Sequence, residues 1–115
     1  MKYLVASDGS NAGDSVSSQF SRASCFAIVD SENDSFDILH NGNDVDLNSI
    51  FADSARAGVK RLICGNIGPN ALSLAQKNSI AVVLSPHITV RKAVEMASKD
   101  QLRVVHTPSS HHIAH

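Results

Sequence analysis

Aromatic residues are scarce in this sequence: tryptophan is absent, and phenylalanine and tyrosine together make up 4% of 115 residues. A hydrophobic share of 43% is nevertheless enough to build the core of one domain, mostly from aliphatic side chains. Long apolar runs are also missing, and the longest are of strand length, which excludes a transmembrane helix. The opening residues carry one lysine and a very short apolar stretch, so they predict a first strand rather than a signal peptide.

Cysteine and concentrated charge are scarce as well. The two cysteines, Cys25 and Cys64, in a chain with no predicted leader favour free thiols in a reducing cytoplasm. The formal net charge is −1, and no dense basic stripe with interleaved aromatic residues occurs. We therefore expect neither a nucleic acid nor a membrane as a partner.

Hydrophobic periodicity predicts a single α/β domain over residues 1–105, with the element order β-β-β-α-β-α-β-α. The short polar turn at 31–34 predicts an antiparallel hairpin, and the later alternation of strand and helix predicts parallel strands. Gly58 and Asn78 should end the first two helices, Asn78 in the left-handed conformation. We expect strands over 2–7, 24–30, 35–40, 59–64 and 80–84, and helices over 46–57, 69–77 and, with Thr89 as N-cap, up to Ser98.

Two segments lack the pattern of a packed element. Residues 8–18 are rich in glycine, serine, asparagine and aspartate, which predicts a mobile loop. Residues 106–115 contain four of the six histidines among serine, threonine and proline, which predicts a disordered, His-rich tail. Such a tail either binds metal loosely or is passive, and the sequence leaves both readings open.

Residues 64–71, with the sequence CGNIGPNA, form the most informative segment of the chain. They follow an apolar, β-branched run and precede a run with helical spacing, which is typical of a strand, a glycine turn and a helix start. Pro69 suits the first helical position, and Gly65 and Gly68 allow another group to approach the backbone closely. Unpaired N–H groups and the helix dipole would make this turn an anion site, unless it is a connection without a ligand.

Three segments together resemble a known family. VASDG (residues 5–9), VSSQFSRASCF (residues 16–26) and the GNIGPNA turn are similar to the dinitrogenase iron–molybdenum cofactor biosynthesis family, and the resemblance covers residues 2–104. That family includes small carriers of the nitrogenase cofactor and its precursors, and the molybdenum–copper orange protein. The resemblance implies a ribonuclease-H-like, three-layer α/β/α fold with a mixed five-stranded sheet. It also implies a metal–sulfur cluster containing molybdenum, with iron or copper, and cofactor-assembly or acceptor proteins as partners.

The chain departs from the family pattern in one of these segments. The family usually carries a pattern like HFGRA, where this chain has Gln19 and Ser21 in place of the histidine and the glycine. That histidine is a suspected contact of the metal centre in the family, so Gln19 argues against imidazole ligation at this position. The two departures favour the relatives that are not nitrogenase proteins.

The predicted topology brings several segments to one edge of the sheet, where open α/β sheets bind ligands. The carboxyl ends of the first, fourth and fifth strands meet there with the beginning of the antiparallel second strand. The candidate cofactor-binding residues at this edge are Asp8, Gln19, Arg22, Cys64, Gly65, Asn66, Gly68, Asn70 and His87. Cys64 and His87 are also candidate metal ligands.

Each ionisable candidate also has a purely structural interpretation. Arg22 offers a permanent cation to an anionic ligand, or it forms an ion pair with Asp8 or Asp14. Cys64 is either a soft metal ligand whose pKa the neighbouring helix N-terminus lowers, or a buried core thiol. His87 either ligates a metal or donates to a sulfide, or it is an exposed turn residue.

These residues favour a non-enzymatic carrier or storage protein for an anionic metal–sulfur cluster, with residues 11–18 closing over the cargo. A nuclease, which a ribonuclease-H-like fold could suggest, needs several carboxylates at this edge. Asp8 qualifies, but the fourth strand ends in Cys64, Gly65 and Asn66 without an acid. The alternative is a regulatory or interaction module that binds a nucleotide or a small anion at the same glycine turn.

Overall fold

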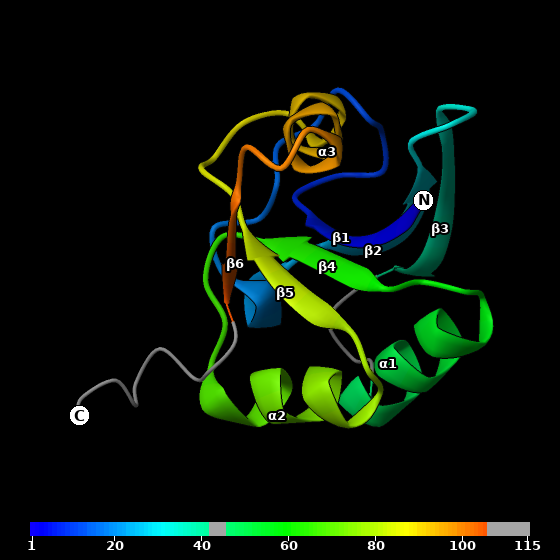
Figure 1. Cartoon of the computed structure of the whole chain (residues 1–115), viewed down its shortest axis with the longest axis vertical. Coiled ribbons are helices and arrows are strands. Elements are labelled where there is room, and N and C mark those ends of the chain that lie inside the picture. The colour runs from blue at the N-terminus through cyan, green and yellow to red at the C-terminus, as the bar shows by residue number, and fades with distance from the viewer. Residues whose placement is uncertain (42–45, 106–115) are drawn as a thin grey trace.

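The computed structural model of the chain describes residues 1–41 and 46–105, in which one mixed sheet lies between two helical layers (Figure 1). The predicted His-rich tail at 106–115 lies outside the described residues. The strands are β1 (Lys2–Ser7), β2 (Cys25–Asp30), β3 (Ser35–Asn41), β4 (Arg61–Cys64), β5 (Ala81–Leu84) and β6 (Arg103–Val105). The helices are α1 (Leu47–Arg56), α2 (Pro69–Lys77) and α3 (Val90–Ser98), with a short 3-10 helix, η1, at Phe20–Arg22.

Over the described residues the sheet contains six strands in the order β3-β2-β1-β4-β5-β6, whereas the sequence predicts five. The first five follow the predicted ribonuclease-H-like arrangement: β1, β4 and β5 are parallel, and β2 and β3 are antiparallel neighbours beyond β1. The additional strand, β6, pairs antiparallel with β5, with Arg103 opposite Leu84. A three-residue strand carries too little periodic pattern to be predicted, and here it covers an edge of β5 that would otherwise be open.

Capping residues explain why the helices start where the sequence predicts. The helix α2 has the predicted bounds, with Pro69 at its first position. Asp46 and Thr89 are the N-caps of α1 and α3, and their side chains accept hydrogen bonds from the N–H groups of Asn48 and Lys92. Each cap satisfies a backbone donor that the first helical turn leaves unpaired.

The residues that end the first two helices are predicted only in part. Gly58 has a φ of +90°, in the left-handed region that favours glycine. The prediction of a left-handed Asn78 is wrong, because its φ is −99° and the next residue, Ser79, has the positive φ of +59°. Asn78 Nδ2 donates to the carbonyl oxygen of Leu74 at 2.8 Å, which keeps Asn78 at the helix end.

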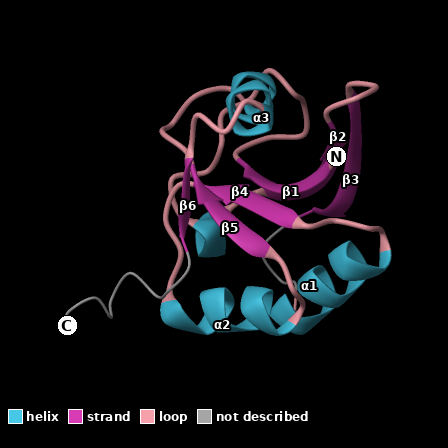
Figure 2. Ribbon diagram, in the orientation of Figure 1, coloured by secondary structure: helices cyan, strands magenta, loops and turns pink. Residues whose placement is uncertain are grey.

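Different helices cover the two faces of the sheet, α1 and α2 on one side and α3 on the other (Figure 2). The side chains of the central strand β1 alternate between two cores. Leu4 and Ala6 pack with the α1–α2 layer, and Tyr3 and Val5 pack with the α3 layer. A strand buried on both faces is a continuous apolar run, so its sequence predicts the strand without showing which side chain faces which layer.

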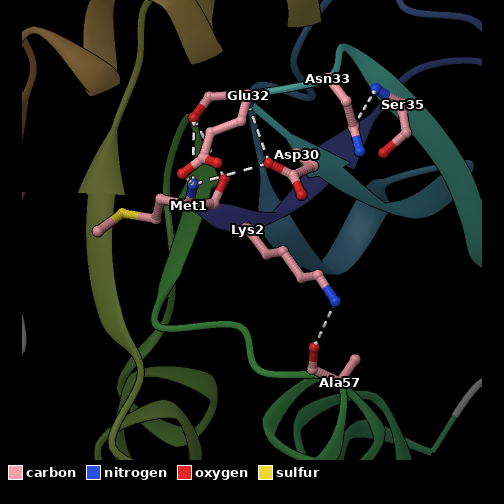
Figure 3. A network of polar contacts seen from close by, with 8 residues as sticks. Met1, Lys2, Asp30, Glu32, Asn33, Ser35 and Ala57 are labelled. Atoms are coloured by element: carbon pink, nitrogen blue, oxygen red, sulfur yellow. Dashed lines mark hydrogen bonds and ion pairs between the residues drawn. The ribbon is translucent and has the colours of Figure 1, made fainter.

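Polar contacts fix the start of β1 against the β2–β3 hairpin (Figure 3). The amino group of Met1 lies 3.7 Å from Asp30 Oδ1 and 3.3 Å from Glu32 Oε2. Lys2 Nζ donates to the carbonyl oxygen of Ala57 at 3.0 Å, which ties β1 to the end of α1. Exposed contacts of this kind add little stability individually, and here they supplement the β1–β2 pairing that positions the hairpin.

The sequence predicts a mobile loop over residues 8–18, but residues 16 and 17 of this segment are buried and hydrogen-bonded to distant parts of the chain. Val16 and Ser17 are 0% and 2% exposed. The N–H of Val16 donates to the carbonyl oxygen of Ile88 at 2.8 Å, and the N–H of Ser17 donates to that of Ala6 at 2.7 Å. The segment 15–18 therefore lies as a fixed element across the carboxyl-end edge of the sheet. The polar composition of this segment suggests exposure to solvent, but its backbone groups form hydrogen bonds with distant parts of the chain, which the composition does not reveal.

Candidate functional site

A pocket of about 360 Å³, here called the turn pocket, lies at the carboxyl-end edge between η1 and the turn from β4 to α2. It brings together three of the predicted residues, Gln19, Asn66 and Gly68, from segments that are far apart in the sequence. The lining combines polar or small side chains with buried apolar ones: Gln19, Phe20, Ser21, Asn66, Ile67, Gly68 and Pro69. The sequence did not identify Phe20, Ser21, Ile67 or Pro69 as site residues, although all four lie within the family-like segments.

Backbone hydrogen bonds join the two walls of the turn pocket. The N–H of Phe20 donates to the carbonyl oxygen of Asn66 at 2.8 Å. The N–H of Gly65 donates to the carbonyl oxygen of Ser17 at 2.9 Å, and Ser17 Oγ donates to that of Gln19 at 2.7 Å. The pocket is therefore preformed by contacts within the chain, which reduces the ordering that a ligand would have to impose.

Gly65 is required by the chain itself rather than by a ligand. A Cβ added at Gly65 would lie 2.6 Å from the carbonyl oxygen of Ser18 and 2.7 Å from its Cα. Both distances are far below van der Waals contact, and both atoms belong to the backbone. The close approach predicted for this glycine is thus to the segment 15–18, and its N–H is already used by Ser17.

The start of α2 leaves several backbone N–H groups open beside the turn pocket. Gly68 is the N-cap, and no side chain caps the helix. In the part of the chain that the structure describes, the N–H groups of Ile67, Gly68, Asn70 and Ala71 have no hydrogen-bond acceptor. A Cβ added at Gly68 would meet nothing within 4 Å, so this backbone is accessible. Open donors at the positive end of a helix dipole favour an anion.

Arg22 is a cation next to this pocket. It is the last residue of η1, whose other residues line the turn pocket, and its side chain is exposed. Within residues 1–41 and 46–105 its guanidinium forms no ion pair, and the predicted alternative partner Asp8 is bound to His87 instead. A planar guanidinium is permanently charged and matches oxyanions and sulfides as a hydrogen-bond donor.

Asp8 and His87 contact each other, but they do not line the turn pocket. His87 Nε2 lies 2.8 Å from Asp8 Oδ2, and both side chains are exposed. Among the described residues, no group of three or more histidine, cysteine, aspartate or glutamate side chains could hold a metal ion. The pair therefore joins the end of β1 to the turn after β5 as a polar surface contact.

Cys64 is a core residue. Its side chain is 0% exposed and packs in the apolar layer between the sheet and the helices α1 and α2. Burial raises the pKa of its thiol to about 12, so the predicted lowering of this pKa is wrong. Loss of water around a thiolate outweighs the favourable end of the neighbouring helix. Its burial and its raised pKa both favour the interpretation of Cys64 as a core thiol.

Asn70 lies outside the turn pocket. It lines a separate hollow between the beginning of α1 and the length of α2, together with Asn48, Ser73 and Lys77. The backbone N–H of Asn70 is one of the open donors at the helix start, so only its main chain is available to a ligand of the turn pocket.

Comparisons with known proteins agree with this architecture. The orange protein from Desulfovibrio gigas, in its apo form, superposes with a TM-score of 0.80 at 22% identity, over 94% of this chain and 95% of that chain. A Thermotoga protein described as a candidate NifB protein of the DUF35 family gives 0.77 at 24% identity, with 94% and 97% covered. A candidate dinitrogenase from Methanocaldococcus jannaschii gives 0.72 at 21% identity, also with 94% and 97% covered. These identities establish a shared fold, and no curated protein sequence matches the chain.

The fold and the site define a class of protein: a three-layer α/β domain whose pocket lies where the central parallel strand β4 passes into a helix. The sequence profile of the dinitrogenase iron–molybdenum cofactor family matches residues 1–100, which is most of the chain. The chain therefore belongs to the dinitrogenase iron–molybdenum cofactor family. The match confirms the resemblance that the three sequence segments indicate.

Proposed function

We propose that this chain is a small, non-enzymatic carrier or storage protein for an anionic metal–sulfur cluster that contains molybdenum, with iron or copper. The proposal makes residues 1–105 the cofactor-binding unit and the turn pocket the binding site. Its partners are the cluster or its precursor and the proteins that assemble or accept it. The carrier acts in the cytoplasm, where Cys25 and Cys64 stay reduced.

The observation that carries the proposal is the set of open donors around the turn pocket. Backbone N–H groups at the start of α2 point to an anionic ligand. The side-chain amides of Gln19 and Asn66 and the hydroxyl of Ser21 add neutral donors, and Arg22 adds a positive charge. Sulfide and oxide atoms on the surface of a cluster accept such hydrogen bonds, so the pocket suits an anionic cluster as cargo.

The chemistry of the lining also supports a carrier that releases its cargo. No thiol, imidazole or carboxylate group lines the turn pocket in the described part of the chain. A cluster bound there would be held by hydrogen bonds and charge rather than by bonds from side chains to its metals. Gln19, which replaces the usual histidine of the family pattern, fits this mode of binding. Weak, non-covalent contacts allow transfer to an acceptor protein.

The test is an anaerobic titration of the full chain with tetrathiomolybdate, with and without Cu(I), followed by desalting and visible spectroscopy. The four tail histidines are changed to glutamine so that they do not bind metal. We expect a coloured species that stays with the protein at fixed stoichiometry. Arg22→Gln should weaken retention, whereas Arg103→Gln, which removes an exposed arginine of β6, should not.

Other outcomes discriminate between the proposal and its alternative. Cys64→Ala should retain the colour, because the buried thiol is not part of the proposed site. If no colour is retained and the protein binds phosphate or a nucleotide through the same helix start, the regulatory or interaction module is the better description. If colour is retained but Arg22→Gln and Arg103→Gln behave alike, the cluster binds elsewhere.

A further inference from the structure

A second hollow of about 290 Å³ lies on the α3 side of the sheet, between α3 and the β2–β3 hairpin. We call it the hairpin groove. Its apolar floor is formed by Val29, Phe36 and Val94, and its exposed rim includes Asp34, Arg91 and Glu95. It shares no lining residue with the turn pocket, so a ligand here would bind independently of the proposed cluster.

The hairpin groove exists because one helix covers a sheet face that is wider than the helix. Among the described helices only α3 lies on this face, and it packs over the central strand β1 (Figure 2). Phe36 is paired with Val29, and Val29 with Tyr3, so these side chains share the α3 face. Further along β3 on the same face, Ile38 is 46% exposed. The outer part of this face therefore offers apolar surface that the described chain does not cover.

The rim of the hairpin groove carries one positive and one negative side chain without an ion-pair partner among the described residues. Glu95 is already neutralised, because Lys99 Nζ lies 3.3 Å and Lys92 Nζ 3.8 Å from its carboxylate oxygens. In the described residues, neither the guanidinium of Arg91 nor the carboxylate of Asp34 has an ion-pair partner. A permanent cation on α3 and an anion on the hairpin thus line the same groove, beside its apolar floor.

The position of Asp34 is fixed by the shape of the hairpin turn. Asp34 has a φ of +56°, the left-handed conformation that a tight turn requires. Asp30 Oδ1 accepts a hydrogen bond from the N–H of Glu32 at 3.0 Å, and Asn33 Oδ1 accepts one from the N–H of Ser35 at 3.1 Å (Figure 3). On the opposite wall, the backbone N–H of Arg91 donates to the carbonyl oxygen of Ala12 at 3.0 Å. Both charged residues are therefore attached to well-bonded backbone.

We propose that the hairpin groove binds a small zwitterion with an apolar body, of the class of a free α-amino acid with an aliphatic or aromatic side chain. The ligand carboxylate pairs with the guanidinium of Arg91, which can bind it through two parallel hydrogen bonds. The ligand ammonium group pairs with Asp34. The apolar side chain of the ligand covers Phe36 and Val94, which removes their surface from water.

The test measures binding of L-leucine and L-phenylalanine to the full chain by titration calorimetry and by chemical-shift changes of the groove residues. Isocaproate, which lacks the ammonium group of leucine, and isoamylamine, which lacks its carboxylate, are the matched ligands. We expect saturable binding of at least one amino acid and weakening by about tenfold or more for both analogues.

Variants of the two rim residues complete the test. Arg91→Gln and Asp34→Asn should each weaken amino-acid binding by about tenfold or more. Their controls are Arg103→Gln on β6 and Asp37→Asn on β3, which remove like charges outside the groove and should leave binding unchanged. Absence of amino-acid binding at millimolar concentration would overturn the proposal. So would equal affinity for leucine and its two analogues, or unchanged affinity in Arg91→Gln.

Discussion

Replacing Gly65 by alanine is the sharpest test of how the turn pocket is built. The added methyl group would lie 2.6 Å from Ser18 O, 2.7 Å from Ser18 Cα and 2.8 Å from Ser17 O. These are backbone atoms of a segment that is hydrogen-bonded to the rest of the chain, so they cannot rotate away as a flexible side chain would. The segment 15–18 must move away from β4, and the hydrogen bond from the N–H of Gly65 to Ser17 must lengthen or break.

The size of the effect follows from two contributions. Forcing an extra methyl group into a well-packed region costs about 1–3 kcal/mol. Loss of the hydrogen bond between Gly65 and Ser17 adds about 1 kcal/mol. We therefore expect Gly65→Ala to lower the free energy of unfolding by about 2–4 kcal/mol, which corresponds to a fall of roughly 10–25 °C in Tm for a domain of this size.

Urea denaturation followed by circular dichroism measures this change, with Gly13→Ala as the matched control. Gly13 lies in the same loop region, but a Cβ added there meets nothing within 4 Å. Gly13→Ala should be neutral or stabilise the protein by about 0.4–1 kcal/mol, since alanine restricts the unfolded chain. If Gly65→Ala and Gly13→Ala unfold at the same urea concentration, the close approach of Ser17 and Ser18 does not constrain residue 65.

Three further predictions concern titration and capping. Burial raises the pKa of Cys64 from 9.0 to about 12, so above pH 9 the unfolded chain loses this proton first and the free energy of unfolding falls with rising pH. That fall should be steeper than in Cys64→Ala by up to about 1.4 kcal/mol per pH unit, and equal slopes would contradict it. Hydrogen bonds from Arg56 and His40 lower the pKa of Asp53. These bonds therefore stabilise the fold above pH 4, and this stabilisation is lost as pH falls through the lowered pKa. In an acid titration, the free energy of unfolding should fall less for Asp53→Asn than for the native chain. Thr89→Ala should lower the free energy of unfolding by about 1 kcal/mol through loss of the N-cap bond to Lys92, whereas Thr89→Ser should retain most of it in the same denaturation assay.

Local signals explain which parts of the fold the sequence predicts. Pro69, Asp46 and Thr89 mark helix starts because capping depends on neighbouring residues only. The β2–β3 hairpin follows from a short polar turn between two apolar runs. The strand β6 is not predicted, because its partner, β5, lies elsewhere in the sequence and three residues are too few to show hydrophobic alternation.

The candidate site is predicted less completely, because it depends on contacts between distant segments. Gln19, Asn66 and Gly68 do meet at one pocket, as strand direction and the family-like motifs indicate. Cys64 ends a strand that is apolar on both faces, and no alternation in its sequence shows that the thiol faces the core. The fixed position of segment 15–18 depends on hydrogen bonds to Ala6, Gly65 and Ile88 that no local pattern reveals.

Amide chemical shifts would show whether an anionic metal–sulfur cluster binds in the turn pocket, as we propose. An anaerobic titration of the isotope-labelled full chain with tetrathiomolybdate reports each backbone N–H separately. We expect the largest and saturable shifts in two segments, 19–22 and 66–71, which surround the pocket. Shifts confined to Asp8 and His87, to the histidines of residues 106–115, or to no residue at all would contradict this proposal.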